Sequence, residues 1–253
     1  MKISAVIITF NEEKNIGRCL GSLQGVVDEI VVIDSFSTDK TAEICAAYNV
    51  RFETNLFEGH IQQKNHAMRR ATHEWVLSLD ADEALTDELK KGIEAVKGNE
   101  TFDGYELSRL TNFCGQWIHH AGWYPDRKVR LWNRTKGEWG GQNPHDKVIM
   151  KKGAKIGRLK GDLLHYSFYT IEQHVQTIQK FSTIAAESAY KNGKRANLVV
   201  NILIGPWFTF IKKYFLQLGF LDGYFGLVIS VNTAYSRFLK YIKLREIQQK
   251  HGK

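Results

Sequence analysis

The sequence predicts an α/β protein with a mostly parallel sheet flanked by helices, followed by a C-terminal helical region. Near-continuous apolar runs rich in β-branched residues, such as 4–10 and 29–34, are typical of strands covered on both faces. Segments with helical spacing separate these runs, and strands that alternate with helices form parallel sheets. The 253 residues, 43% of them hydrophobic, suffice for one large domain with an appendage.

The predicted elements follow one another through the first 100 residues. The first strand, 4–10, is also the N-terminal apolar run, which is too short for a signal peptide. A helix is expected next, over 11–24, because its apolar residues recur at helical spacing. The later strands are predicted at 29–34, 50–53 and 74–79, and the later helices at 41–48 and 61–71.

Cysteine usage and charge limit the chemistry. Cys19, Cys45 and Cys114 are widely spaced, which predicts neither a disulfide framework nor a zinc site and fits a reducing compartment. Residues 1–150 carry 18 Lys and Arg against 22 Asp and Glu, whereas residues 151–253 carry 17 against 5. The basic excess is therefore C-terminal and indicates an anionic partner, either phospholipid or nucleic acid.

Polar residues follow three of the predicted strands at 9–12, 34–35 and 80–82. The carboxyl ends of parallel strands meet at one edge of a sheet, where ligands bind, so these clusters are expected to converge. Neither the GxGxxG loop nor the GxxxxGK[ST] loop is present. The stretch SLDADE places three carboxylates close together, and such charges need a positive partner. Oxygen ligands suit Mg²⁺ or Mn²⁺ shared with a diphosphate.

Three ordered motifs, SAVIITFNEE, DEIVVIDSFSTDKTAEI and LSLDADE, resemble those of the family 2 glycosyltransferases. The resemblance covers at least residues 3–150 and implies a GT-A fold, an inverting reaction and a nucleotide-sugar donor. It implies a catalytic domain over 1–170, with a nucleotide-sugar half at 1–100 and an acceptor half at 101–170. The remaining residues, 171–253, are predicted as a basic amphipathic helical region.

The same resemblance assigns roles to single residues of the nucleotide and metal sites. DADE is the DxD motif of the family, so Asp82 would bind the metal and Asp80 the ribose or the metal shell. A late histidine of the pattern, His165, would complete the metal shell. Asp34 would bind the uracil edge. The other residues implied around the nucleotide are Thr9, Asn11, Glu12, Lys64 and Asn65.

Inverting transfer needs a carboxylate that removes the proton of the acceptor hydroxyl. Asp146 matches the family position of this base, with Glu138 as the alternative, although by residue type alone both would be solvated loop carboxylates. His145 is expected to steer the acceptor or the base. In the tryptophan-rich stretch, Trp123 and Arg130 are expected to bind the acceptor, whereas Trp132 is expected in the core.

Other motifs and segments extend these expectations. GWYPDRKVRLW, NPHDK, LLHYSF and YFLQLGFLDGYFGL resemble the lipopolysaccharide-core branch of the family, which moves glucose from UDP-glucose onto an inner-core heptose. Glu83 is expected to cap the helix that begins near Thr86, because negative charge favours a helix N-terminus. Flexible loops are predicted at 99–112 and 136–142. The sequence leaves open whether the chain forms a homo-oligomer.

The C-terminal region contains two uncharged runs, 196–211 and 223–236. Both are shorter than the ~20 residues of a spanning helix, so burial at a membrane interface is predicted. Residues 236–250 read as a basic amphipathic helix. The protein is therefore expected in the cytoplasm, peripheral on the anionic inner face of the cytoplasmic membrane, with a lipid-linked glycan as acceptor. Packing of these helices on the catalytic domain or on a second subunit is the alternative.

Two other functions compete with this hypothesis. A polyprenyl-phosphate glycosyltransferase would attack with a phosphate oxygen and would need no carboxylate base. A non-catalytic basic protein that binds nucleic acid or membrane would explain the pI near 9.3. The basic residues lie among long apolar runs and not on an exposed aromatic platform, which disfavours a nucleic-acid partner.

Overall fold

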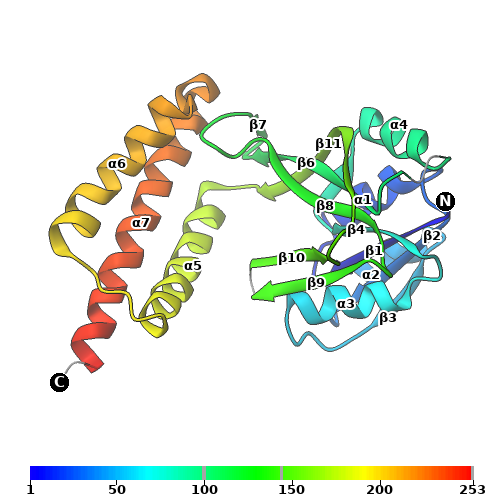
Figure 1. Cartoon of the computed structure of the whole chain (residues 1–253), viewed down its shortest axis with the longest axis horizontal. Coiled ribbons are helices and arrows are strands. Elements are labelled where there is room, and N and C mark those ends of the chain that lie inside the picture. Colours follow the sequence, from blue (N-terminus) through cyan, green and yellow to red (C-terminus); the bar gives the residue numbers. More distant parts are fainter. Residues whose placement is uncertain (99–100, 143–144, 252–253) are drawn as a thin grey trace. The chain divides into compact units, whose positions relative to one another are not determined.

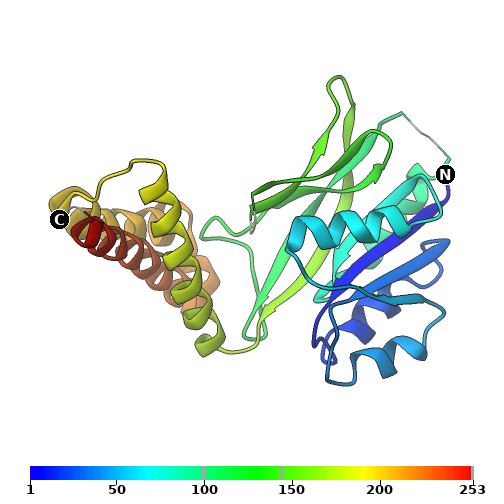
Figure 2. The same cartoon turned by 90° about the horizontal axis from the view of Figure 1, so that it is seen from below.

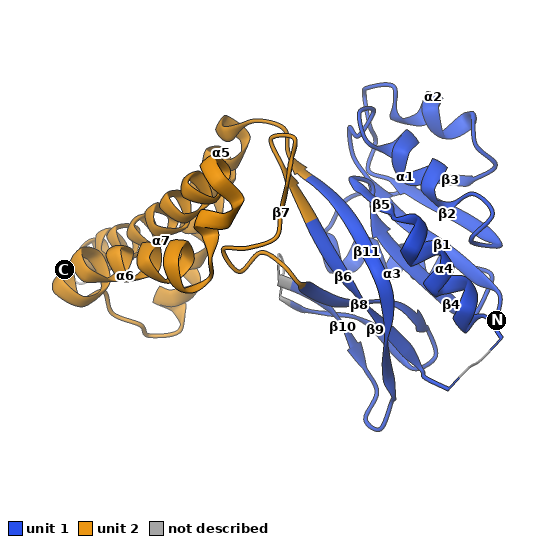
Figure 3. Cartoon of the chain, turned by 90° about the horizontal axis from the view of Figure 1, so that it is seen from above, with its two compact units in different colours: residues 1–110, 126–166 blue, residues 111–125, 167–253 orange. Residues whose placement is uncertain are grey.

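The computed structural model describes residues 1–98, 101–142 and 145–251, without the side chains of Gln142 and His145. The chain divides into two compact units, which have different colours in Figure 3. Unit 1 comprises residues 1–110 and 126–166, and unit 2 comprises residues 111–125 and 167–253. The division after residue 166 lies close to the predicted end of the catalytic domain, but residues 111–125 belong with the C-terminal helices.

The first half of unit 1 has the predicted alternation of strands and helices, and the α/β class is confirmed (Figure 1). Side chains of the first strand alternate between two cores, so that Ile7 packs with the helix Ile16–Leu23 while Val6 packs with the helix His60–Arg70. The parallel strands lie in the order β3 (Arg51–Thr54), β2 (Glu29–Asp34), β1 (Ile3–Thr9) and β4 (Trp75–Asp80). The helices are α1 (Ile16–Leu23), α2 (Thr41–Ala46) and α3 (His60–Arg70).

The sheet continues beyond β4 with antiparallel strands that the sequence did not reveal. The predicted loops 99–112 and 136–142 are wrong over most of their length, because Gly104–Phe113 and Gly137–Gln142 are strands. The continuation, from β4 outward, is β8 (Asp126–Asn133), β6 (Gly104–Phe113), β11 (Ile156–Phe168) and β5 (Glu83–Leu85), with β7 (Gln116–Ile118) paired to β6. A separate hairpin consists of β9 (Gly137–Gln142) and β10 (His145–Met150).

Helix α4 (Asp87–Val96) corrects one expectation about the acidic motif. Its cap is Thr86, whose hydroxyl accepts a hydrogen bond from Leu89 N. Glu83 does not cap this helix, because it lies in β5 with its side chain fully buried. A buried carboxylate needs a partner, and its partners belong to the candidate site described below. Trp132 is fully buried in β8, as predicted.

Unit 2 is built on three helices that lie side by side (Figures 1 and 2). Leu244 is fully buried against Ala186 and Ala189, so the apolar side of the predicted amphipathic helix packs on the helix Ile171–Lys191. Thr170 and Gln173 form a capping box at the start of α5. The helical elements are α5 (Ile171–Lys191), η1 (Leu198–Ile204), α6 (Gly205–Ile211), η2 (Lys212–Leu216), η3 (Gly219–Asp222) and α7 (Gly223–His251).

Three of these elements, η1, α6 and η2, make one continuous helical segment, 198–216. Counting uncharged residues alone gave a run too short to cross a membrane, whereas the helical segment includes Lys212 and Lys213 and reaches 19 residues. By length and composition this segment, unlike the other described helices, could cross a membrane. Only 11% of its apolar stretch is buried in the protein. Much of the exposed apolar surface of unit 2 therefore lies on 198–216, and more of it lies on the following residues, such as Leu221 and Tyr224.

Candidate active site

The register of the parallel strands brings the predicted nucleotide residues to one edge. Thr9 pairs with Asp34 across β1 and β2, and Asp80 lies opposite Ile8 on the other side of β1. The convergence expected from the sequence is therefore present. Asp34 is buried and accepts hydrogen bonds from the backbone N and the hydroxyl of Ser37. That hydroxyl also accepts a 2.8 Å bond from Asn11 N, which fixes the loop after β1.

Lys64 joins the acidic motif to the predicted base. Its Nζ atom lies 2.9 Å from Asp80 Oδ1 and 2.8 Å from Asp146 Oδ2. Helix α3 supplies the lysine, the end of β4 supplies Asp80, and β10 of the hairpin supplies Asp146. Only 6% of the lysine side chain is exposed, and Trp139 covers it with a ring whose centroid lies 4.4 Å from Nζ.

Arg130 supplies a second cation to the same motif. Its Nη2 atom lies 2.8 Å from Glu83 Oε1 and 3.2 Å from Asp80 Oδ2. Burial by itself raises the pKa of Asp80, but Lys64 and Arg130 outweigh it and hold that pKa well below its ordinary value. Arg130, which the sequence predicts at the acceptor, is 3% exposed, and its guanidinium contacts the carboxylates of the motif. Two cations of the chain itself therefore neutralise much of the acidic motif.

Asp82 and His165 form the part of the site that fits a divalent cation. Asp82 Oδ2 lies 3.1 Å from His165 Nε2, close to the roughly 3 Å between neighbouring ligands of an octahedral ion bound at ~2.1 Å. Asp80 was predicted as the third ligand of the metal, but its two carboxylate oxygens contact Lys64 and Arg130. Among the described residues no three His, Cys, Asp or Glu side chains gather as a metal centre. The pair suits an ion whose other ligands come from a phosphate.

Glu12 lies beside this pair, within range of its charge. The pKa of Glu12 lies above its ordinary value, mainly because the carboxyl group is buried. A hydrogen bond from Asn15 lowers this pKa, and the negative charges of Asp82 and Asp39 raise it. Thr9 Oγ1 is also buried at this edge and has no hydrogen-bond partner within the described part of the chain. A buried hydroxyl without a partner is costly. The edge therefore has unsatisfied polar capacity that a ligand can fill.

Other predicted residues lie elsewhere or serve the fold. Asn65 exchanges two hydrogen bonds with the backbone of Trp139, at 2.8 and 3.0 Å, and so ties α3 to β9. Glu138 is exposed, and on a strand it faces away from its neighbour Trp139. Trp123 packs in unit 2 against Phe113. The side chain of His145 lies outside the described residues.

No specific role was predicted for Trp139, and the helix-capping role predicted for Glu83 is wrong. Trp139 is 4% exposed and covers Lys64, while Glu83 accepts a 2.9 Å hydrogen bond from Asp80 N and pairs with Arg130. The crowding of three carboxylates was the available signal, since it demands cations nearby. It did not say which of the chain's 35 lysines and arginines supply them.

Parallel strands with acidic residues, cations and the Asp82–His165 pair at their carboxyl edge suit the binding and transfer of phosphate-linked groups. Comparison with known proteins makes the class specific. The model described as "Glycosyl transferase family 2" matches residues 4–155. The chain belongs to this family and is a glycosyltransferase.

Two relatives match along nearly the whole chain. An uncharacterized glycosyltransferase of Rickettsia typhi is 32% identical over 98% of this chain and 88% of its own length. The lipopolysaccharide core biosynthesis glycosyltransferase LpsC of Rhizobium meliloti is 28% identical over 100% of this chain and 94% of its own length. Among solved structures, S. aureus TarS 1–349 in complex with UDP is 17% identical, covers 100% of this chain and 92% of that one, and has a TM-score of 0.47.

Proposed function

We propose that the protein transfers a hexose, glucose from UDP-glucose, to a lipid-anchored glycan such as the lipopolysaccharide inner core, with inversion and with Mg²⁺ or Mn²⁺. Family membership supports sugar transfer. The likeness of the whole chain to LpsC, whose name assigns it to lipopolysaccharide core synthesis, supports the class of acceptor. The donor sugar rests on the motif resemblance.

One observation carries the proposal. Asp80 of the DxD motif and Asp146, the predicted base, are 66 positions apart, and both contact the Nζ atom of Lys64 at under 3 Å. A base must lie near the reacting centre, and the metal-binding motif marks where the donor diphosphate lies. The lysine contact thus joins the two functions in one cluster of unit 1, as transfer requires.

The residues divide the reaction among them. The acceptor hydroxyl would lose its proton to Asp146 while its oxygen forms a bond to the anomeric carbon, and the bond from that carbon to the diphosphate would break. Asp82 and His165 would hold the cation, which, when bound, supplies neutralising charge to the departing diphosphate. Thr9, Asn11 and other residues at the sheet edge would bind the nucleoside. A general base of this kind contributes roughly 10²- to 10⁴-fold.

A lipid-anchored acceptor explains the second unit. Residues 151–253 hold 17 Lys and Arg against 5 Asp and Glu, and the exposed apolar segment 198–216 lies within that part of the chain. Cationic and apolar residues together favour an anionic membrane surface. We therefore propose that the protein acts at the inner face of the cytoplasmic membrane as a peripheral protein.

The experiment compares Asp82→Asn with Asp146→Asn in two assays, calorimetric binding of UDP with Mn²⁺ and transfer of glucose to a lipopolysaccharide core acceptor. We expect Asp82→Asn to lose Mn²⁺-dependent UDP binding. Asp146→Asn is expected to keep UDP binding within a few fold and to lose transfer by roughly 10²-fold or more, because only the base is removed.

Glu138→Gln is the matched control, since Glu138 is an exposed carboxylate of the same hairpin. It should leave both assays unchanged. Unchanged UDP binding by Asp82→Asn would contradict the metal assignment. Full transfer by Asp146→Asn would contradict the base assignment and favour an acceptor that needs no base, such as polyprenyl phosphate.

A further inference from the structure

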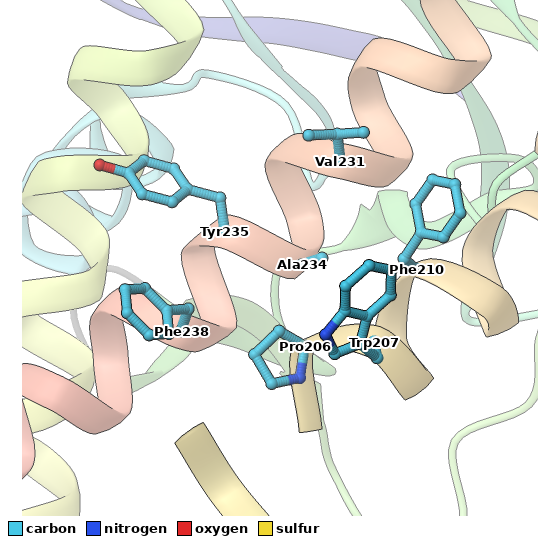
Figure 4. Close-up of a pocket in the computed structure, with 7 residues that line it drawn as sticks. All are labelled: Pro206, Trp207, Phe210, Val231, Ala234, Tyr235 and Phe238. Atoms are coloured by element: carbon cyan, nitrogen blue, oxygen red, sulfur yellow. The ribbon is translucent and has the colours of Figure 1, made fainter. Parts of the chain in front are cut away.

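An apolar pocket lies within unit 2, between the helical segment 198–216 and α7 (Figure 4). Its volume is 330 Å³, the size of a small-molecule site. The polar tip of the Tyr235 side chain points away from the other lining side chains in Figure 4. Three lining residues come from α6 and four from α7: Pro206, Trp207, Phe210, Val231, Ala234, Tyr235 and Phe238.

The pocket opens in a surface that is itself apolar. Trp207 at the pocket is 72% exposed, and Leu216 further along the same segment is 69% exposed. Soluble proteins rarely expose contiguous apolar patches of large size unless the patch binds something. Tryptophan is also enriched where an apolar body meets water at a membrane interface. The pocket is therefore a recess in a surface that favours hydrocarbon.

The charge of the surrounding chain selects the occupant. Between residues 191 and 245 the sequence has nine Lys and Arg and a single acidic residue, Asp222. Asp222 is buried and contacts His120 Nδ1 at 3.0 Å, so it does not offset the exposed cations. Lys212 is exposed in the apolar segment itself, and Lys194 and Arg195 are exposed just before it. An apolar recess in a cationic surface complements a lipid with an anionic head.

We propose that this pocket binds one hydrocarbon chain of an anionic membrane lipid, which holds the enzyme at the surface where its acceptor is anchored. The inference deepens the proposed membrane association and rests on it. The hydrocarbon chain would enter between α6 and α7 with Trp207 beside it, and the exposed Lys194, Arg195 and Lys212 would supply positive charge for the lipid phosphate. Burial of methylene groups supplies affinity, and charge supplies the preference for anionic heads.

The test measures binding of lysophosphatidylglycerol below its micelle concentration to the full chain, by calorimetry without donor or acceptor. We expect one lipid per chain. Val231→Phe should weaken binding by about tenfold or more, the equivalent of excluding two methylene groups. Val231 is chosen because it lines the pocket and is 48% exposed, so a larger side chain there reduces the space in the pocket without overpacking the core. Lysophosphatidylcholine of the same chain length should bind more weakly.

Leu216→Ala is the matched control, because it removes apolar surface outside the pocket lining. It should bind the lysolipid as the native chain does. In vesicles of equal parts phosphatidylcholine and phosphatidylglycerol with brominated chains, quenching should reach Trp207 and be absent in Trp207→Phe. If Val231→Phe binds lysophosphatidylglycerol as tightly as the native chain, the pocket is not the lipid site. If the native chain is a dimer in lipid-free buffer and Val231→Phe dissociates it, the pocket is covered by a second copy of the chain and the lipid proposal is wrong. Equal binding of the two lysolipids would overturn the preference for anionic heads. Sugar transfer is not measured, so loss of the pocket leaves the proposed activity standing.

Discussion

The two units depart from the common arrangement of residues in opposite ways. Unit 1 buries charge: Lys64, Glu83 and Arg130 all have side chains at most 6% exposed. Unit 2 exposes apolar side chains along 198–216, where only 11% of the apolar stretch is buried. Charged side chains are almost never fully buried unless paired, and large exposed apolar patches mark binding surfaces.

The contrast between buried charges in unit 1 and exposed apolar side chains in unit 2 indicates which kind of ligand each unit suits. Buried charges in unit 1 are held in fixed positions by their partners, and fixed charges suit a polar donor and a reaction that moves charge. Exposed apolar side chains in unit 2 need a partner from outside the unit. Under the proposed function, unit 1 performs the chemistry through electrostatics, and unit 2 attaches the protein to the membrane through the hydrophobic effect.

The largest expected effect is on the buried charges of unit 1. Arg130→Met should lower the free energy of unfolding by about 3–5 kcal/mol, because it takes from the fully buried Glu83 its nearer ion-pair partner, at 2.8 Å, and leaves Arg109 at 3.6 Å. Urea denaturation measures this loss. Arg158→Met is the control, since Arg158 is 54% exposed and pairs with Glu106 at 3.5 Å. The control should cost under about 1 kcal/mol, and equal losses in the two variants would remove the contrast between buried and exposed charge.

The next effect concerns His174 of unit 2, whose pKa is strongly lowered. Burial lowers the pKa of His174 from 6.5 to about 4. The unfolded chain therefore takes up a proton below pH ~6.5 while the folded chain stays neutral, so stability is present above that pH and is lost as pH falls toward 4. The expected loss is up to about 3 kcal/mol. Asn232 Nδ2 lies 3.1 Å from His174 Nδ1, and protonation removes this acceptor.

His174→Phe tests this origin, because a phenyl ring keeps the contacts with Phe113 and Phe168 but cannot titrate. Thermal unfolding followed by near-UV circular dichroism between pH 4 and 6.5 should show a flatter pH dependence in the variant. The exposed His60 of unit 1 gives the control His60→Gln, whose pH dependence should match the native chain. A native slope in His174→Phe would assign the acid sensitivity to other groups.

The elements predicted correctly from the sequence are those of the parallel part of unit 1, whose hydrophobic patterns lie within short segments of the chain. The apolar runs that became β1, β2 and β4 need no distant partner to be recognised, and the polar residues after them converge because parallel strands share an edge. Strand β6 was predicted as a loop, because its mixed polar and apolar residues depend on pairing with β8. Such long-range pairing leaves no pattern in a short window.

The candidate site shows the same limit. Asp82 and His165 were matched to the metal by motif, and they lie 3.1 Å apart. Lys64 and Arg130 were placed at the nucleotide and the acceptor, but their pairing with Asp80 was not predicted, since they come from α3 and β8 and only the folded chain brings them to β4. A cluster of like charges reveals that a counter-charge exists but not its position in the chain.

The smallest expected effect is on stability, at the exposed surface of unit 2. Leu203 is 56% exposed while its neighbour Ile202 is 7% exposed. Leu203→Ser should change the free energy of unfolding by less than about 0.5 kcal/mol, whereas Ile202→Ala should cost about 2–5 kcal/mol. Leu203→Ser should nevertheless weaken sedimentation with phosphatidylglycerol vesicles, because the lost side chain contributes to attachment and not to folding. A large loss of stability in Leu203→Ser, with unchanged vesicle binding, would show that the apolar surface serves the fold and would end the division of labour between the units.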